Sequence, residues 1–142
     1  LGTMGLCSSI GLGLALSQPK PVIAIDGDGS VLTNLGTLST IGNNTADNFV
    51  LLIIDNGSYG STGDQPTYAG RKTDLKKVAE ACGCDTVIQC QAEDTAAALQ
   101  TALDSGRMTV IVSKCQSGTI PVPVIDLPPA VIRHRFMEQV SA

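Results

Sequence analysis

The sequence predicts an α/β fold in which a parallel β-sheet carries helices on both faces, giving three layers. Short apolar runs alternate with segments of helical periodicity along the chain, an order typical of parallel sheets with right-handed crossovers. Two of these runs, Val22–Asp26 and Phe49–Asp55, are apolar almost throughout, as expected for strands buried on both faces. At 142 residues the chain is long enough for one core, so a single domain over residues 1–142 is expected.

The first half of the chain supplies two helices and the first strand. Apolar residues recur every three or four positions over Gly5–Ser17 and again over Ser30–Gly42, which predicts a helix in each segment. The glycines in the first helix indicate close packing, because each costs about 1 kcal/mol relative to alanine. The stretch Leu1–Leu16 lacks the basic start of a signal peptide, so it is interpreted as a buried helix.

The second half begins with the strand Phe49–Asp55. The linker Asn56–Arg71 is too long for an idle connection and is therefore expected to be a functional loop. A helix is predicted to run to about Ala81 with Thr73 as its N-cap. The remaining expected elements are the strand Thr86–Ile88, the helix Glu93–Ser105, the strand Met108–Val112, an extended tail over Pro121–Pro129 and a last helix over Ala130–Val140.

Composition excludes several classes of protein. The net charge of −4 argues against a nucleic-acid partner, and no apolar run approaches the roughly 20 residues of a membrane span. The five cysteines show no Cys-x-x-Cys pair, so ordinary buried thiols are expected rather than a zinc or iron–sulfur site. Such thiols favour a reducing, cytoplasmic location.

Small and acidic residues follow both buried strands. The first strand breaks into Gly27-Asp28-Gly29-Ser30 and the second into Asp55-Asn56-Gly57-Ser58. Because the carboxyl ends of parallel strands meet at one edge of a sheet, both breaks are expected at the edge where such folds bind ligands. Asp28 and Asn56 offer oxygen ligands of the kind that Mg²⁺ prefers, and glycines let a phosphate approach the backbone. These residues predict a metal–diphosphate site.

The same residues resemble the diphosphate-binding domain of thiamine diphosphate (ThDP) enzymes. The family signature is Gly-Asp-Gly, a spacer of some two dozen residues, and Asn-Asn; here 25 residues, Ser30 to Ile54, separate Gly27-Asp28-Gly29 from Asp55-Asn56. Within the family, the sequence resembles the sulfopyruvate and phosphonopyruvate decarboxylases. That narrower resemblance lies in three segments: Gly2 to Gly5, Asp55 to Tyr59 and Ser61 to Thr67. The sequence begins with Leu1-Gly2-Thr3-Met4-Gly5, inside what looks like a motif, which leaves open whether residues precede Leu1.

The resemblance implies a set of site residues. Asp28, the side chain of Asn56 and the backbone carbonyl of Ser58 would bind Mg²⁺. Gly29 and Ser30 would contact the diphosphate. The full set implied to bind ThDP is Gly2, Met4, Gly27, Asp28, Gly29, Ser30, Asn56, Ser58 and Tyr59.

Two positions of the motif call for separate expectations. Asp55 replaces the first Asn of the signature; its carboxylate would either strengthen Mg²⁺ binding or serve as a cap or turn in the loop. Met4 stands where the family places a bulky apolar residue under the bent cofactor, and the alternative is an ordinary core methionine. Gly2 and Gly5 would give the cofactor room.

The loop after Asn56 is expected to face the substrate. Its hydroxyls and amide suit a sulfonate or phosphonate, with Arg71 and Lys72 as sources of positive charge. The candidate substrate ligands are Ser61, Thr62 and Gln65, together with Tyr59 and Asp64. A solvated loop with routine turn hydrogen bonds is the alternative. His134, Arg133 and Arg135 are expected to be surface or interface residues.

The resemblance implies the β subunit of a ThDP- and Mg²⁺-dependent 2-oxo acid decarboxylase. The favoured reaction converts sulfopyruvate to sulfoacetaldehyde and CO₂, in coenzyme M biosynthesis. The glutamate that activates the cofactor is not found here and would come from a pyrimidine-binding α subunit, giving a hetero-oligomer of at least α2β2. The isolated chain is therefore expected to be inactive.

Two alternatives stay open. The chain would otherwise belong to a phosphonopyruvate decarboxylase or an acetolactate-synthase-like carboligase, or be a ThDP-binding module without catalysis. Pyruvate–ferredoxin-type β chains are disfavoured because their cysteine clusters are absent.

Overall fold

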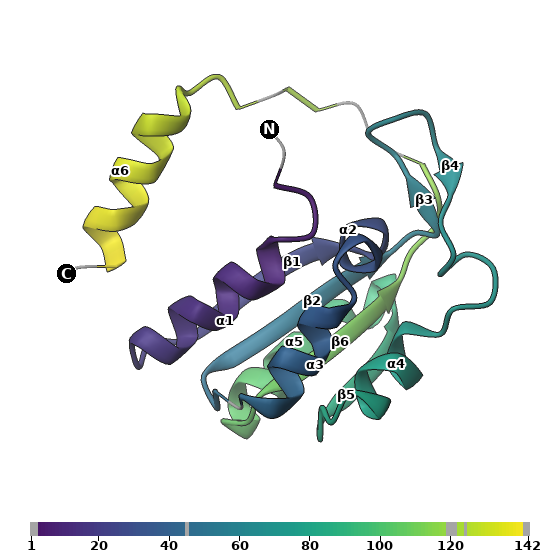
Figure 1. The fold of residues 1–142 in the computed structure, drawn as a ribbon, viewed down its shortest axis with the longest axis horizontal. Coiled ribbons are helices and arrows are strands. Elements are labelled where there is room, and N and C mark those ends of the chain that lie inside the picture. Colours follow the sequence, from purple (N-terminus) through teal and green to yellow (C-terminus); the bar gives the residue numbers. More distant parts are fainter. Residues whose placement is uncertain (1–2, 45, 119–121, 124, 141–142) are drawn as a thin grey trace.

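A central sheet of four parallel strands organises the structure (Figure 1). The computed structural model describes residues 3–44, 46–118, 122–123 and 125–140. The strand order is β1-β2-β6-β5, with β1 over Val22–Gly27, β2 over Phe49–Asp55, β5 over Val87–Gln91 and β6 over Thr109–Lys114. The last pairs in register are Gly27 with Ile54 and Asp55 with Lys114, so β1, β2 and β6 end at the same edge.

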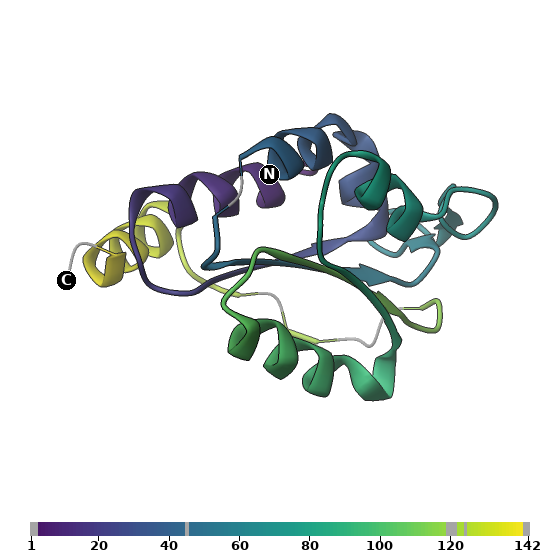
Figure 2. The same ribbon diagram turned by 90° about the horizontal axis from the view of Figure 1, so that it is seen from below.

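Helices cover both faces of the sheet, which confirms the predicted three-layer α/β fold. Figure 2 shows helices above and below the sheet. The upper helices are α1 Cys7–Ser17, α2 Asp28–Thr33, α3 Gly36–Asn43 and α4 Leu75–Ala81, and the lower one is α5 Thr95–Ser105 after a 3-10 turn at Ala92–Asp94.

The apolar strands separate two hydrophobic cores. Phe49, Leu51 and Ile53 of β2 face the upper helices, while Val50 and Leu52 pack with α5. Alternate side chains of a strand point to opposite faces, so a strand covered on both faces must be apolar throughout. This is why the run Phe49–Ile54 could be read from the sequence as a central strand.

The predicted helix Ser30–Gly42 is wrong in detail, because it is two helices. The chain leaves helical geometry between α2 and α3, and Asn34 there caps α2 with φ −138° and ψ 55°. The Asn34 side-chain amide donates to the carbonyl of Gly5 at 3.0 Å. The break thus gives the segment before α1 a place to pack beside α2.

Two further expectations about helices need correction. The N-cap of α4 is Asp74, whose carboxylate accepts the N–H of Lys77 at 3.1 Å, and not Thr73. The first helix is buried on one side only: Gly11 is so close to Ala24 that a Cβ on it would lie 2.7 Å from the Ala24 Cβ, whereas Ile10 and Leu16 are exposed.

The loop after β2 contains a small hairpin. Strands β3 Ser58–Tyr59 and β4 Gln65–Pro66 pair in antiparallel fashion, and the hairpin extends beyond the carboxyl edge of the sheet (Figure 1). The expected last helix is present as α6 Pro129–Val140. The extended tail before it was expected over residues 121–129, of which 121 and 124 lie outside the described residues.

Candidate functional site

A cavity of about 320 Å³ lies where β1 and β2 end. It brings together most of the residues predicted for the diphosphate site, although they come from separate segments of the chain. The lining residues are Met4, Gly27, Asp28, Gly29, Ser30, Ile54, Asn56, Ser58, Tyr59, Gly60 and Ser61. The two strand ends therefore meet in one cavity, as the parallel sheet predicted.

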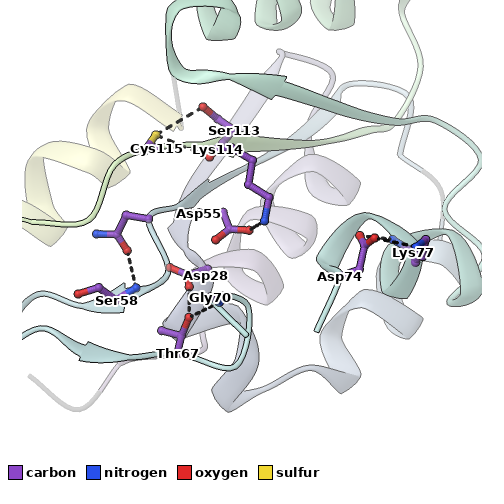
Figure 3. Close-up of polar contacts among 11 residues, drawn as sticks. Asp28, Asp55, Ser58, Thr67, Gly70, Asp74, Lys77, Ser113, Lys114 and Cys115 are labelled. Atoms are coloured by element: carbon purple, nitrogen blue, oxygen red, sulfur yellow. Dashed lines mark hydrogen bonds and ion pairs between the residues drawn. The ribbon is translucent and has the colours of Figure 1, made fainter. Parts of the chain in front are cut away.

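Asp28 is almost completely buried at the start of α2, with 1% of its surface exposed. The Thr67 hydroxyl donates a hydrogen bond of 2.5 Å to its Oδ2 atom (Figure 3). Burial raises the pKa of Asp28, and the nearby negative charge of Asp55 adds to this, whereas the Thr67 hydrogen bond opposes it. A buried carboxylate of this kind would be stabilised by a cation in the cavity.

Asn56 and Ser58 are held in a tight local turn. The Asn56 Oδ1 atom accepts the N–H of Ser58 at 3.0 Å, and the Ser58 hydroxyl donates to Asp64 at 2.8 Å. Asp64 adopts a left-handed backbone conformation with φ 57°. Both Asn56 and Ser58 line the cavity, and their roles as metal ligands stay predictions.

The ring of Tyr59 packs so closely against Gly29 that no side chain fits at this position. A Cβ on Gly29 would collide with the Tyr59 ring and lie 3.3 Å from the Thr67 methyl. The absence of a side chain therefore lets the β3–β4 hairpin close over the start of α2. The sequence offered a different reason for this glycine, namely close approach of a phosphate.

The segment before α1 is hydrogen-bonded to α2. The N–H of Gly5 donates to the Ser30 hydroxyl at 2.8 Å. Gly5 has φ 86°, and a Cβ there would lie 2.5 Å from the Thr33 hydroxyl oxygen. Gly5 thus makes room for α2, and the room that it was expected to give the cofactor stays a prediction. Gly2 lies outside the described residues.

Met4 projects at the mouth of the cavity. Its side chain lines the cavity and is 51% exposed, so it is not an ordinary core methionine. Its side chain is flexible and apolar, and its steric role under the cofactor stays a prediction.

The candidate substrate residues separate into two groups. Ser61 lines the cavity. The Thr62 hydroxyl donates to Gln65 Oε1 at 2.9 Å, and these two residues are exposed and absent from the cavity wall. Arg71 lines a different cavity, formed with Tyr59, Pro66 and Tyr68.

Two long-range contacts, one in the site and one between the neighbouring strands β2 and β6, were not predicted from the sequence. Thr67 lies within a motif that the sequence singled out, but its contact with Asp28 spans 39 residues. Asp55 pairs with Lys114, which lies beside it on β6. The spacing of apolar residues in β2 and β6 could have suggested their pairing, but no local signal identified the ion pair. His134 lies on the surface of α6, where it pairs with Glu138. This agrees with the expectation that it is a surface or interface residue.

The donor set fits a Mg²⁺–diphosphate. Among the described residues, no group of three or more His, Cys, Asp or Glu side chains is placed to hold a metal. A site of one carboxylate, one amide oxygen and one carbonyl leaves coordination positions for diphosphate oxygens and water, which Mg²⁺ requires.

Among the residues that the structure describes, no helix is both long and apolar enough to span a bilayer.

Comparison with known proteins identifies the family of this chain. Residues 1–113 match the family described as thiamine pyrophosphate enzyme, C-terminal TPP binding domain. The chain therefore belongs to the thiamine pyrophosphate (ThDP) enzyme family, of which it contains the C-terminal cofactor-binding domain. The family predicted from the sequence is thus confirmed.

Two relatives and one solved structure illustrate the range of similarity. The sulfopyruvate decarboxylase subunit beta of Methanocaldococcus jannaschii is 47% identical, over 99% of this chain and 75% of that subunit. The phosphonopyruvate decarboxylase of Streptomyces viridochromogenes is 40% identical, over 96% of this chain and 34% of that enzyme. The crystal structure of benzoylformate decarboxylase from Polynucleobacter necessarius matches with a TM-score of 0.66 at 20% identity, over 85% of this chain and 25% of that one, and so supports the fold.

Proposed function

We propose that this chain is the β subunit of a ThDP-dependent sulfopyruvate decarboxylase that yields sulfoacetaldehyde and CO₂, a reaction of coenzyme M biosynthesis. This is the function predicted from the sequence, and the similarity to a sulfopyruvate decarboxylase β subunit over nearly the whole chain bears it out. The observation that carries the proposal is the meeting of Asp28 and Asn56 in one cavity at the carboxyl edge of the sheet.

The chain's own residues would hold the diphosphate end of the cofactor. Asp28, the Asn56 amide and the Ser58 carbonyl would bind Mg²⁺, and Gly29 and Ser30 would meet the diphosphate oxygens. ThDP supplies the acidic thiazolium carbon and the electron sink that decarboxylation of a 2-oxo acid needs. Met4 would support the ring region from the cavity mouth. The hairpin that carries Tyr59 and Ser61 would exclude water from one side of the site.

A partner subunit is needed to complete the site. The chain contains three glutamates, Glu80, Glu93 and Glu138; all are exposed, and none lines the cavity. We propose that the activating carboxylate comes from a pyrimidine-binding α subunit in an assembly of at least α2β2; the name subunit beta of the relative supports a partner chain. The match to the phosphonopyruvate decarboxylase covers 34% of that enzyme.

The substrate class is a small 2-oxo acid that carries an anionic group. Hydroxyls of the hairpin, among them that of Ser61, which lines the cavity, suit a sulfonate. Phosphonopyruvate is the second candidate, because an enzyme acting on it is 40% identical. We place the enzyme in the cytoplasm, where the five cysteines, which are free in the structure, stay reduced.

Reconstitution tests the proposal. The purified chain with ThDP, Mg²⁺ and sulfopyruvate should release no CO₂, and coexpression with its α subunit should produce turnover. Phosphonopyruvate and pyruvate in parallel reactions identify the substrate, and detection of a joined acetohydroxy acid would reveal a carboligase. Clear turnover by the isolated chain would refute the requirement for a partner. ThDP binding without decarboxylation by the assembled pair would indicate a non-catalytic module.

A further inference from the structure

Thr67 is fully buried and contacts both segments of the site, the one that carries Asp28 and the one that carries Asn56 and Ser58. It follows β4, at the end of the hairpin, and is far in sequence from Asp28. Its hydroxyl donates to Asp28 Oδ2 at 2.5 Å (Figure 3). Its backbone N–H donates to the carbonyl of Gly57 at 2.9 Å. Gly57 lies between Asn56 and Ser58, so one residue contacts both segments that carry the predicted metal ligands.

The direction of the Thr67 hydroxyl is fixed by a third contact. The backbone N–H of Gly70 donates to the Thr67 oxygen at 3.3 Å. Since that N–H approaches the oxygen, the single hydroxyl hydrogen is free to point to Asp28. The donor therefore has a set orientation, and Oδ2 of Asp28 has a set partner. Asp28 also lines the cavity, so its carboxylate is held by Thr67 at the place where a ligand would bind.

We infer that Thr67 is a positioning residue that presents Asp28 to Mg²⁺ through a single oxygen and keeps it in register with the Asn56–Ser58 turn. The inference rests on the proposed function, because it concerns the same metal site. Mg²⁺ demands nearly ideal octahedral geometry, so a carboxylate that can rotate or bind through both oxygens is a poorer ligand. Hydrogen bonds that orient metal ligands typically contribute 10- to 100-fold in metal affinity.

The test compares variants of Thr67 in the assembled enzyme, with Mn²⁺ as a paramagnetic substitute for Mg²⁺. Thr67→Val keeps the shape and removes the hydroxyl, and Thr67→Ser keeps the hydroxyl and removes the methyl. Thr109→Val is the matched control. Thr109 is as buried as Thr67, but it lies at the start of β6, away from the cavity, and its hydroxyl donates to the Arg107 carbonyl. Mn²⁺ affinity is measured by electron paramagnetic resonance in the presence of ThDP.

The expected result is a 10- to 100-fold weaker Mn²⁺ affinity in Thr67→Val, by the typical effect of such partners. Thr67→Ser and Thr109→Val should bind Mn²⁺ as the wild type does. Wild-type affinity in Thr67→Val, even with a lower melting temperature, would overturn the inference and leave a purely structural role. If Thr67→Val does not fold, Thr67→Ala against Thr67→Ser decides, since these differ only in the hydroxyl. A wild-type enzyme that binds no Mn²⁺ with ThDP would instead overturn the proposed function itself.

Discussion

The carboxylate of Asp55 forms an ion pair with the ammonium group of Lys114 across two adjacent central strands (Figure 3). Asp55 is 3% exposed, and Lys114 reaches it from the end of β6. The N–H of Cys115 donates to the Asp55 carbonyl at 2.9 Å, which extends the pairing by one residue. Asp55 does not line the diphosphate cavity. Its charge is therefore used in joining β2 to β6, and the cap or turn role considered from the sequence is not what the structure shows.

This pair makes a specific prediction about stability. Lys114→Met leaves a buried carboxylate without its partner and should destabilise the chain by about 3–5 kcal/mol. Asp55→Asn should cost less, because the Lys114 side chain is partly exposed and its ammonium can turn to water. The double variant should be more stable than Lys114→Met alone. Urea unfolding of the four proteins measures this; equal losses from the two single variants would contradict the argument.

The start of α4 provides a prediction about pH. Asp74→Ala should cost about 0.5–2 kcal/mol, as removal of an N-cap does, while Thr73→Ala should change stability little. The hydrogen bond from the Lys77 N–H holds the pKa of Asp74 below its ordinary value. The ionised cap therefore stabilises the fold above about pH 4, and this contribution is lost as the pH falls through the folded-state pKa.

Thermal unfolding at several pH values tests the cap. The difference between wild type and Asp74→Ala should shrink below pH 4. A difference that is independent of pH, or a larger loss from Thr73→Ala, would be incompatible with Asp74 as the cap.

The buried carboxylate of Asp28 should lower the stability of the metal-free protein, and it should be needed for metal binding. Burial raises the pKa of this carboxyl above its ordinary value, so the fold favours the neutral form and loses stability as the pH rises through the folded-state pKa. Asp28→Asn should therefore raise the melting temperature at neutral pH without metal. It should also remove the increase that Mg²⁺ and ThDP produce in the wild type.

The control for Asp28 is Asp85→Asn, which removes the same charge from an exposed position. This variant should keep both the wild-type melting temperature and its response to Mg²⁺ and ThDP. An Asp28→Asn protein that is stabilised by the two ligands as strongly as the wild type would show that the carboxylate does not bind the metal.

Met4 should affect turnover and not folding. Because its side chain is 51% exposed at the cavity mouth, Met4→Ala should change the free energy of unfolding by less than about 0.5 kcal/mol. If it supports the cofactor, kcat of the assembled enzyme should fall by roughly 100-fold, the scale of a small misplacement of reacting groups. Leu16→Ala, at the far end of α1 and similarly exposed, is the control and should leave kcat unchanged.

The fold and the centre of the site were predictable because they depend on local patterns. The run Phe49–Ile54 marks a strand buried on both faces, and the parallel arrangement follows from the alternation of strands and helices. Once that arrangement is fixed, Asp28 and Asn56 must meet at the same edge. Their meeting in one cavity agrees with the sequence-based argument.

The contacts that refine the site were not predictable in this way. Thr67 reaches Asp28 only because the hairpin folds back over Gly29, and Lys114 reaches Asp55 only because β6 lies beside β2. Both contacts join distant segments and leave no periodic signal. The break at Asn34 has the same origin, since it is set by packing against the segment before α1.

The central claim is that Asp28 and Asn56 bind the Mg²⁺ of a diphosphate. A crystal structure of the assembled enzyme grown with ThDP and Mn²⁺, with anomalous diffraction to locate the metal, tests it most directly. The account predicts one Mn²⁺ within about 2.3 Å of an Asp28 oxygen and of the Asn56 Oδ1 atom, bridged to the diphosphate. A metal bound to the diphosphate at a place that neither side chain reaches would contradict it.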